Sequence, residues 1–234
     1  MPSSPQKLKV SGASNYLEML PENARLPGSA AHNEIEVLSG TDGTAPPDTE
    51  GIGIVYADDY VAIVRDRVLF PSGTRGTYLR IFTQPPSDEP AGAIILPFDG
   101  RRFILRRMFR HATRSWEYEA PRGLRNPEDV TLEETARREL HEELGLTAQR
   151  VEQLGIVYGD SGLLASSSAV FLGWVDSGAS NPHPDVSEAF GELVLLELPE
   201  LMQWISRGEI RDGLTLAALC MAMAHGHFSA PPPV

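Results

Sequence analysis

Apolar and polar positions follow a strand-like pattern from residue 54 onward, broken by short runs of turn formers. The segments "VYADDYVAIVRDRVLF" and "GTYLRIFTQ" are rich in β-branched and aromatic residues, and "PSGTRG" between them predicts a turn. Residues 54–83 are therefore expected to form a β-hairpin. Further strands are predicted in "AGAIILPF", "RRFILRRMF" and "WEYEAPRG", the last of which alternates apolar and acidic side chains.

One helix is strongly predicted after these strands. Thr131 and Glu134 have the spacing of a capping box, leucine and alanine recur every four residues from Leu132, and Gly145 is a natural helix stop. Strands are then predicted in "RVEQLGIVYG", "AVFLGWV" and "ELVLLEL", followed by helices in "PELMQWISRG" and "RDGLTLAALCMAMAHG". Strands interrupted by a central helix and closed by others predict an α/β sandwich with a mixed β-sheet.

The first 50 residues have a different composition. Prolines and serines recur there, and "LSGTDGTAPPDTEG" is a run of turn formers. We expect residues 1–50 to form a partly irregular N-terminal extension with few core contacts of its own. It would pack on the body or on a second subunit, or be partly disordered. Residues 51–234 are expected to form the main domain, including the hairpin.

Composition and charge narrow the classes of partner. Hydrophobic residues make up 41% and charged residues 22%, as in ordinary globular proteins, and the formal net charge is −12. Such an acidic chain is not expected to bind a nucleic-acid polymer. No apolar run suits a bilayer, and "MPSSPQKLKV" lacks the apolar core of a secretory signal. The single cysteine, Cys220, lies in an apolar run and is expected to be buried. These features predict a cytoplasmic protein without a membrane partner.

Basic residues are concentrated in one segment of this acidic chain. "RRFILRRMFRHATR" carries six arginines between residues 101 and 114. The cluster is compatible with an exposed strand edge protected by charge. It is equally compatible with a binding surface for a small anionic substrate.

Three glutamates crowd the end of the predicted helix. Residues advance about 100° each around a helix, so Glu139, Glu142 and Glu143 border or overlap the buried stripe. Like charges at this spacing repel, and a partly desolvated carboxylate is destabilising without a counter-charge. A divalent ion such as Mg²⁺ would resolve both problems. The alternative is a surface helix on which the glutamates pair with Arg137 and Arg138.

The same stretch, "RRELHEELGL", resembles the distinctive half of the Nudix box, Arg-Glu-apolar-x-Glu-Glu-x-Gly-apolar. The other half of that pattern places a glutamate before the helix. Here the expected position is Val130 when counted back from Arg138, and Asp129 when counted forward from Gly123, because the loop is longer than usual. Asp129 and Glu128 are both candidates to replace the missing glutamate.

A wider resemblance is to the ADP-ribose pyrophosphatases of the Nudix family. "FILRRMFRHATRSWEYEAPRG" is similar to the stretch before their box, where Glu-x-Pro-Ala-Gly is usual, with Arg122 here in place of alanine. The closing helices are also similar, so the likeness covers roughly residues 54–225 in patches. In that family a β-rich N-terminal region helps to build a dimer, so the resemblance implies a homodimer. No acidic residue follows Gly162 before the next strand, unlike in many such enzymes, which leaves the base and sugar of the substrate open.

The resemblance implies a Nudix-type α/β/α sandwich that hydrolyses the diphosphate linkage of a nucleoside diphosphate derivative. ADP-ribose or a related nucleotide sugar would give a nucleoside monophosphate and a sugar phosphate. Alternatives are a Nudix hydrolase acting on GDP-mannose, a dinucleotide or a free nucleotide, and a non-catalytic module that binds a nucleotide sugar.

The resemblance also implies roles for particular residues. Mg²⁺, or Mn²⁺, would be held by the three helix glutamates and the backbone carbonyl of Arg122. Glu142 and Glu188 are the catalytic candidates; Glu188 would be a general base from a later loop, although a solvated loop glutamate fits its sequence equally well. The substrate-binding candidates are Arg106, Arg110 and Glu119.

Overall fold

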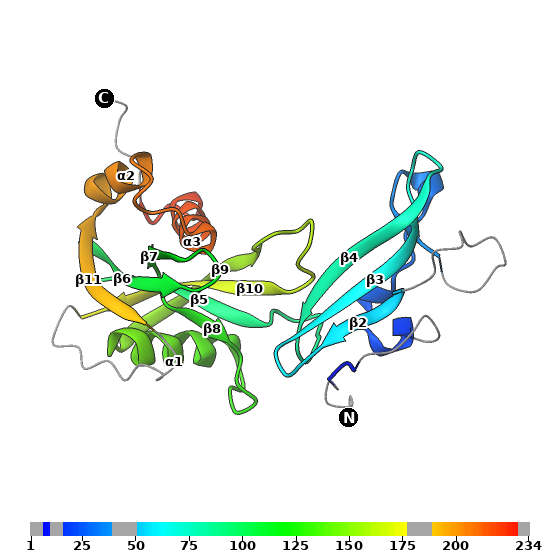
Figure 1. The fold of residues 1–234 in the computed structure, drawn as a ribbon. Helices are drawn as coiled ribbons and strands as arrows, with labels where there is room; N and C mark the ends of the chain where they lie inside the picture. The colour runs from blue at the N-terminus through cyan, green and yellow to red at the C-terminus, as the bar shows by residue number, and fades with distance from the viewer. Residues whose placement is uncertain (1–6, 10–15, 39–50, 177–188, 229–234) are drawn as a thin grey trace. The chain divides into compact units, whose positions relative to one another are not determined.

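The computed structural model describes residues 7–9, 16–38, 51–176 and 189–228. The chain divides into two compact units (Figure 1), of which unit 1 comprises residues 1–91 and 160–167, and unit 2 comprises residues 92–159 and 168–234. This division follows Ala91, whereas the sequence predicts a boundary after residue 50; that domain assignment stays a prediction. Within the described ranges, no helix has the length and apolar character needed to cross a membrane.

Unit 1 is built on a four-stranded antiparallel sheet. Its strands are β1 (Glu36–Val37), β2 (Gly53–Ala57), β3 (Val61–Leu69) and β4 (Arg75–Thr83). The strand β3 pairs with the other three. Strands β3 and β4 form the predicted hairpin, in which the turn formers of residues 70–74 connect the two strands.

The N-terminal extension contributes to the core of unit 1. Three short 3-10 helices precede β1, at Tyr16–Met19, Asn23–Arg25 and Ala30–His32. The side chains of Leu8, Tyr16 and Leu20 are buried against the apolar face of β2, β3 and β4. The Tyr16 hydroxyl donates a hydrogen bond to Asp66 on β3, at 2.7 Å. The expectation that the extension has few core contacts is therefore wrong for its described residues.

Unit 2 contains a seven-stranded mixed sheet. Its strands are β5 (Gly92–Phe98), β6 (Arg102–Arg110), β7 (Ser115–Glu119), β8 (Arg122–Leu124), β9 (Ala148–Tyr158), β10 (Ser167–Val175) and β11 (Phe190–Glu197). The main order is β11-β6-β5-β10-β9, with β7 paired to β6 and β8 paired to β5. Strands β5 and β10 are parallel, and β6 is antiparallel to β5, β7 and β11.

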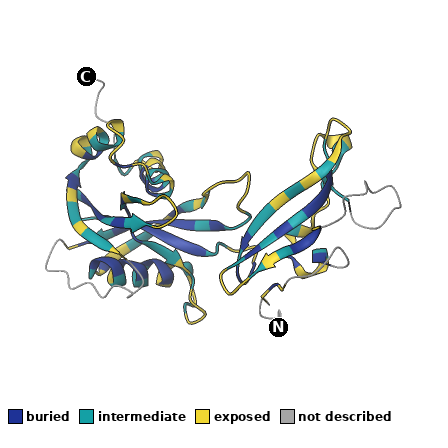
Figure 2. Cartoon of the chain, viewed as in Figure 1, coloured by how far each residue is buried: buried dark blue, intermediate teal, exposed yellow. Residues whose placement is uncertain are grey.

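Helices cover both faces of this sheet, which confirms the predicted α/β/α sandwich. Figure 1 shows α1 (Leu132–Leu144) on one face, and α2 (Leu198–Ser206) and α3 (Gly213–Ala224) on the other. The strand period of two divides the central strands between two cores. On β5, Ile94 and Leu96 pack with α2 and α3, whereas Ala93 and Ile95 pack with α1. Figure 2 shows these central strands as largely buried.

Both ends of α1 follow the sequence prediction. The Thr131 side chain accepts a hydrogen bond from the Glu134 N–H, and the Glu134 carboxylate accepts one from the Thr131 N–H, which completes the capping box. Gly145 adopts the left-handed conformation, with φ 66°, and ends the helix. This rigid helix fixes the positions of the glutamates along it.

The prediction that Cys220 is buried is wrong. The thiol lies on the exposed side of α3. The buried residues of that helix are Thr215, Ala218, Leu219 and Ala222, which recur at the three- and four-residue spacing of one helical face. Cys220 falls outside this face although its sequence neighbours are apolar.

Candidate active site

The three glutamates of α1 lie on or beside its buried side, as their spacing predicts. Leu140 and Leu144 are fully buried against the sheet, and they hold the helix face that carries the carboxylates. Glu143 is 2% exposed and Glu139 is 9% exposed. The side chain of Glu142 is 43% exposed. Two buried carboxylates and one accessible carboxylate therefore occupy the last turns of α1.

The strand β8 approaches these carboxylates closely. The Arg122 N–H donates a hydrogen bond to Oε1 of Glu143, at 3.1 Å. A Cβ atom added at Gly123 would overlap the Glu139 carboxylate. Only glycine therefore allows the β8 backbone and the Glu139 side chain to lie at this separation.

Asp129, one of the two candidates to replace the glutamate that is missing from the Nudix pattern, contacts the helix α1. Its carboxylate accepts hydrogen bonds from the Arg138 guanidinium, the nearest at 3.1 Å, and from the Thr135 hydroxyl at 2.9 Å. Glu128 is exposed, and Val130 is 75% exposed. Of the two candidates left open by the sequence, Asp129 is therefore the one that contacts the helix, and its role as the replacement stays a prediction.

Arg138 links this loop to the carboxylate cluster. Its Nη1 donates to Glu139 at 2.7 Å and to Glu142 at 2.8 Å, while Nε and Nη2 reach Asp129. Burial would raise the pKa of Asp129, but the hydrogen bonds from Arg138, Asn126 and Thr135, together with the charge of Arg138, outweigh burial and lower that pKa below its usual value. The pairing of Arg138 with helix glutamates, which the sequence offered as an alternative to metal binding, is therefore present.

A second charged cluster lies at the ends of β6, β7 and β8. Glu119 is 1% exposed and accepts hydrogen bonds from Arg110 and Arg122. Burial alone would raise the pKa of Glu119, but the hydrogen bonds and charges of the two arginines lower it. Arg122 also reaches Asp212 at 3.0 Å. Two of the predicted substrate-binding residues, Arg110 and Glu119, are thus each other's partners.

Arg106, the third predicted substrate-binding residue, contacts the C-terminal end of α1 and the ring of Phe190. Its Nη1 donates to the Glu143 carbonyl near the end of α1, at 2.5 Å, and its guanidinium lies 4.3 Å from the centroid of the Phe190 ring. A cation at this end of a helix satisfies a terminal carbonyl and interacts favourably with the helix dipole. Its role in binding a substrate stays a prediction.

The arginine cluster between residues 101 and 114 serves more than one purpose. Arg101 pairs with Glu197 and Arg102 with Asp99 at the end of the β5–β6 hairpin, as a charge-protected edge would. Arg110 instead lies with the buried carboxylate of β7. Glu188, the predicted general base, falls outside the described residues.

Asp212 and Thr215 are site residues that the sequence reasoning missed. Asp212 caps α3 by accepting from the Thr215 N–H at 2.8 Å, and the Thr215 hydroxyl accepts from the Ala120 N–H on the β7–β8 connection. This network fixes the start of α3 beside Arg122. The available signal was the spacing "DGLT", in which an aspartate precedes a helix and a threonine follows three residues later.

The arrangement on α1 suits a hard divalent cation. The available donors are the carboxylate oxygens of Glu139, Glu142 and Glu143, and oxygen ligands of this kind favour Mg²⁺ or Mn²⁺. Because Gly123 has no Cβ, the β8 backbone lies against the same carboxylates. This close approach leaves room for a backbone carbonyl of β8 among the metal ligands. The donor set therefore fits the metal that the sequence pattern implies.

Comparisons with known proteins agree with this fold. The family described as NUDIX domain matches residues 88–216, which is more than half of the chain. A solved structure described as "Crystal structure of ADP compounds hydrolase" is similar, with a TM-score of 0.60 and 21% identity over 75% of this chain and 93% of that chain. No curated protein matches the sequence. With its Nudix-type sandwich and the matched carboxylate helix, the chain belongs to the Nudix family of hydrolases.

Proposed function

We propose that the protein hydrolyses the diphosphate linkage of ADP-ribose or a related nucleotide sugar, with Mg²⁺ or Mn²⁺, to give a nucleoside monophosphate and a sugar phosphate. The observation that carries the proposal is the gathering of Glu139, Glu142 and Glu143 beside Gly123 within the NUDIX match. A metal ion held by these residues would neutralise the diphosphate and lower the pKa of a bound water molecule.

The other residues of the site would hold the substrate and its surroundings in place. Arg110 is fixed by a bidentate pair with the buried Glu119, and its side chain is 30% exposed. A fixed guanidinium suits a phosphate or a sugar hydroxyl. Arg122 completes this group through Glu119 and Asp212.

The structure supports an enzyme over a non-catalytic binding module. Val130 was the one departure that favoured the module, and Asp129 compensates for it by holding Arg138. The chain therefore retains the carboxylate cluster and its supporting ion pair. A homodimer and a cytoplasmic location complete the proposal, and sedimentation would test the former.

The proposal is tested by hydrolysis of ADP-ribose, GDP-mannose and a dinucleotide, with product analysis, in Mg²⁺, in Mn²⁺ and in excess chelator. We expect turnover with either ion and none with chelator. Turnover that persists in excess chelator would exclude the metal assignment. Binding of nucleotide sugars without cleavage of any of them would favour the non-catalytic module.

Glu143→Gln tests the residue assignment within the same assay. Glutamine keeps the shape and can still accept the Arg122 N–H, but it removes one charge from the site. We expect turnover to fall at least ~100-fold, which corresponds to about 2.7 kcal/mol of activation free energy. The melting temperature without metal should stay equal or rise, because fewer like charges remain. Glu133→Gln, at an exposed position of the same helix, is the matched control and should keep full turnover.

A further inference from the structure

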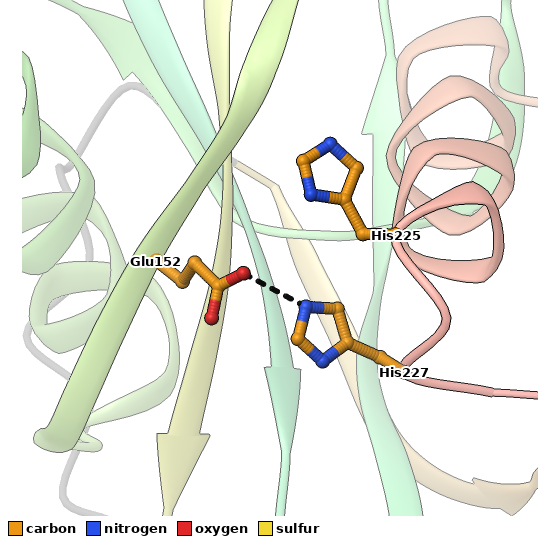
Figure 3. Close-up of side chains that lie close together, drawn as sticks. All are labelled: Glu152, His225 and His227. Carbon is orange, nitrogen blue, oxygen red and sulfur yellow. Dashed lines mark hydrogen bonds and ion pairs between the residues drawn. The ribbon is translucent and has the colours of Figure 1, made fainter.

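A group of metal-ligating side chains lies outside the carboxylate cluster of α1. Figure 3 shows Glu152 on β9 together with His225 and His227, which follow α3. Their potential ligand atoms all lie within 4.8 Å of one another. Nε2 of His227 is 2.9 Å from Oε1 of Glu152, and the two imidazole rings are nearly parallel, with centroids 6.3 Å apart. Potential ligand atoms from β9 and from the end of α3 are therefore gathered in one place, where Glu152 and His227 already contact each other.

The end of α3 sets the positions of both histidines. His225 is the C-cap, and the N–H groups of Gly226 and His227 donate to the carbonyls of Met223 and Ala222, at 2.9 and 3.2 Å. These two hydrogen bonds form a Schellman motif, with Gly226 in the left-handed conformation at φ 80°. The motif reverses the chain at Gly226, so that the two rings lie side by side toward β9.

Aromatic side chains hold His227 and the residue after it in place. The His227 ring packs edge-on against Trp174, with centroids 5.5 Å apart. The next residue, Phe228, packs against Phe98 and Phe103, which anchors the chain that leaves α3.

Arg150 supports the carboxylate. Its Nη2 lies 2.5 Å from Oε2 of Glu152, and its guanidinium stacks on the Trp174 ring at 4.1 Å. The second carboxylate oxygen, Oε1, thus faces His227. In known metal sites, a hydrogen bond to the part of a ligand that does not bind the metal fixes the orientation of that ligand.

We propose that Glu152, His225 and His227 bind a first-row divalent ion such as Zn²⁺. Two imidazole nitrogens and one carboxylate oxygen form a donor set that Zn²⁺ accepts, with a water molecule as the fourth ligand. This set differs from the all-oxygen set on α1, so the two sites select different metals. The exposed His225 ring closes the remaining distance by side-chain rotation. The bound ion clamps the C-terminal end of α3 to β9.

The experiment measures Zn²⁺ binding to chelator-stripped protein by competition with a chromophoric chelator, together with melting curves. Wild type is compared with His225→Ala, His227→Ala and Glu152→Gln, and His32→Ala, an exposed histidine of unit 1, is the control. We expect each ligand variant to lose one equivalent of Zn²⁺, or to bind it more than about 100-fold more weakly. The control should bind as wild type does. Zn²⁺ should raise the melting temperature of wild type and the control only.

Two further variants separate this site from the proposed catalytic site and from general instability. The Glu143→Gln protein should retain the histidine-dependent equivalent, whatever its activity. Gly226→Val should weaken Zn²⁺ binding roughly 10–100-fold, as changes around metal ligands do. Gly226→Asn should retain most of it, because asparagine tolerates the left-handed conformation. If His225→Ala and His227→Ala bind as much Zn²⁺ as wild type with equal affinity, the proposal is overturned.

Discussion

At the scale of single residues, Asp129 shows how a loop of altered length can keep an acidic side chain in contact with the helix that follows it. The extra loop residue displaces the acidic side chain from the position that the pattern predicts, yet the carboxylate still reaches Arg138 and Thr135. Counting along the sequence could not decide between Asp129 and Glu128. Only the path of the loop determines which carboxylate faces the helix.

Asp129→Asn tests this replacement. The substitution removes the charge that accepts from Arg138, whose side chain is 22% exposed, so the lost interaction is partly buried. We expect the free energy of unfolding to fall by about 2 kcal/mol, as for hydrogen bonds to charged groups. Glu128→Gln is the matched control, and it should change stability by no more than about 0.5 kcal/mol. Urea denaturation of both proteins measures the difference, and equal stabilities would show that Asp129 does not support the helix.

Glu119 gives unit 2 a defined sensitivity to acid. Its pKa in the folded protein is lowered from the ordinary value of 4.5, because hydrogen bonds and charges from Arg110 and Arg122 outweigh the effect of burial. A carboxyl with a lowered folded pKa stabilises the protein above its unfolded pKa. That contribution is lost as pH falls below about 4.5 through the folded pKa. Melting curves between pH 7 and pH 3 should show a smaller acid-induced decrease for Glu119→Gln, which starts from a lower stability at pH 7. An unchanged pH dependence would contradict this assignment.

At the scale of helices and strands, the sequence was informative wherever a single period dominated. The four-residue repeat of α1, its capping box and Gly145 predicted both of its ends, and β-branched runs located most of the strands. Two segments that the sequence predicted as single strands each contain two: "VYADDYVAIVRDRVLF" forms β2 and β3, and "WEYEAPRG" forms β7 and β8, which pair with different strands. The predictions failed where tertiary packing decides the outcome. Cys220 lies in an apolar run but on the exposed face of α3. The extension looked irregular because 3-10 turns lack a strong period, although Tyr16 and Leu20 are core residues.

Two leucines of the extension provide a matched test of its packing. Leu20 is 1% exposed, whereas Leu26, six residues later, is 65% exposed. We expect Leu20→Ala to lower the stability of unit 1 by about 2–5 kcal/mol, since it leaves a cavity in the core. Leu26→Ala should cost no more than about 0.5 kcal/mol. Hydrogen exchange of β3 amides, measured at increasing denaturant concentration, compares the stability of unit 1 in the two variants. Equal effects of the two substitutions would show that the extension is not part of the core.

At the scale of the whole molecule, the two units have separate hydrophobic cores. One cluster contains Ile54, Val64 and Phe82, and the others contain only residues of unit 2. The sequence placed the hairpin correctly but did not reveal this division, because strand patterns say nothing about which core a strand joins. The sequence also did not predict that residues 160–167 belong to unit 1, since a short loop carries no sign of the strand with which it pairs.

Separate cores predict separate unfolding steps. Calorimetry should resolve two transitions, because chains with more than one domain commonly depart from two-state behaviour. Leu20→Ala should lower the melting temperature of one transition, and Leu140→Ala, which opens a cavity beneath α1, should lower that of the other. A single transition that both substitutions shift equally would show that the units unfold as one.

The loop of residues 160–167 also constrains the order of events during synthesis. The Ile81 N–H donates to the Leu163 carbonyl, and the Ile81 carbonyl accepts from the Ala165 N–H, so this loop pairs with the outer edge of β4 at Ile81. A ribosome that has just made β4 must still add residues 84–159 before the loop exists. At about 5–20 residues per second, the delay is on the order of 4–15 s. Throughout that interval the backbone edge of β4 is open to water, to chaperones and to the same edge of another nascent chain.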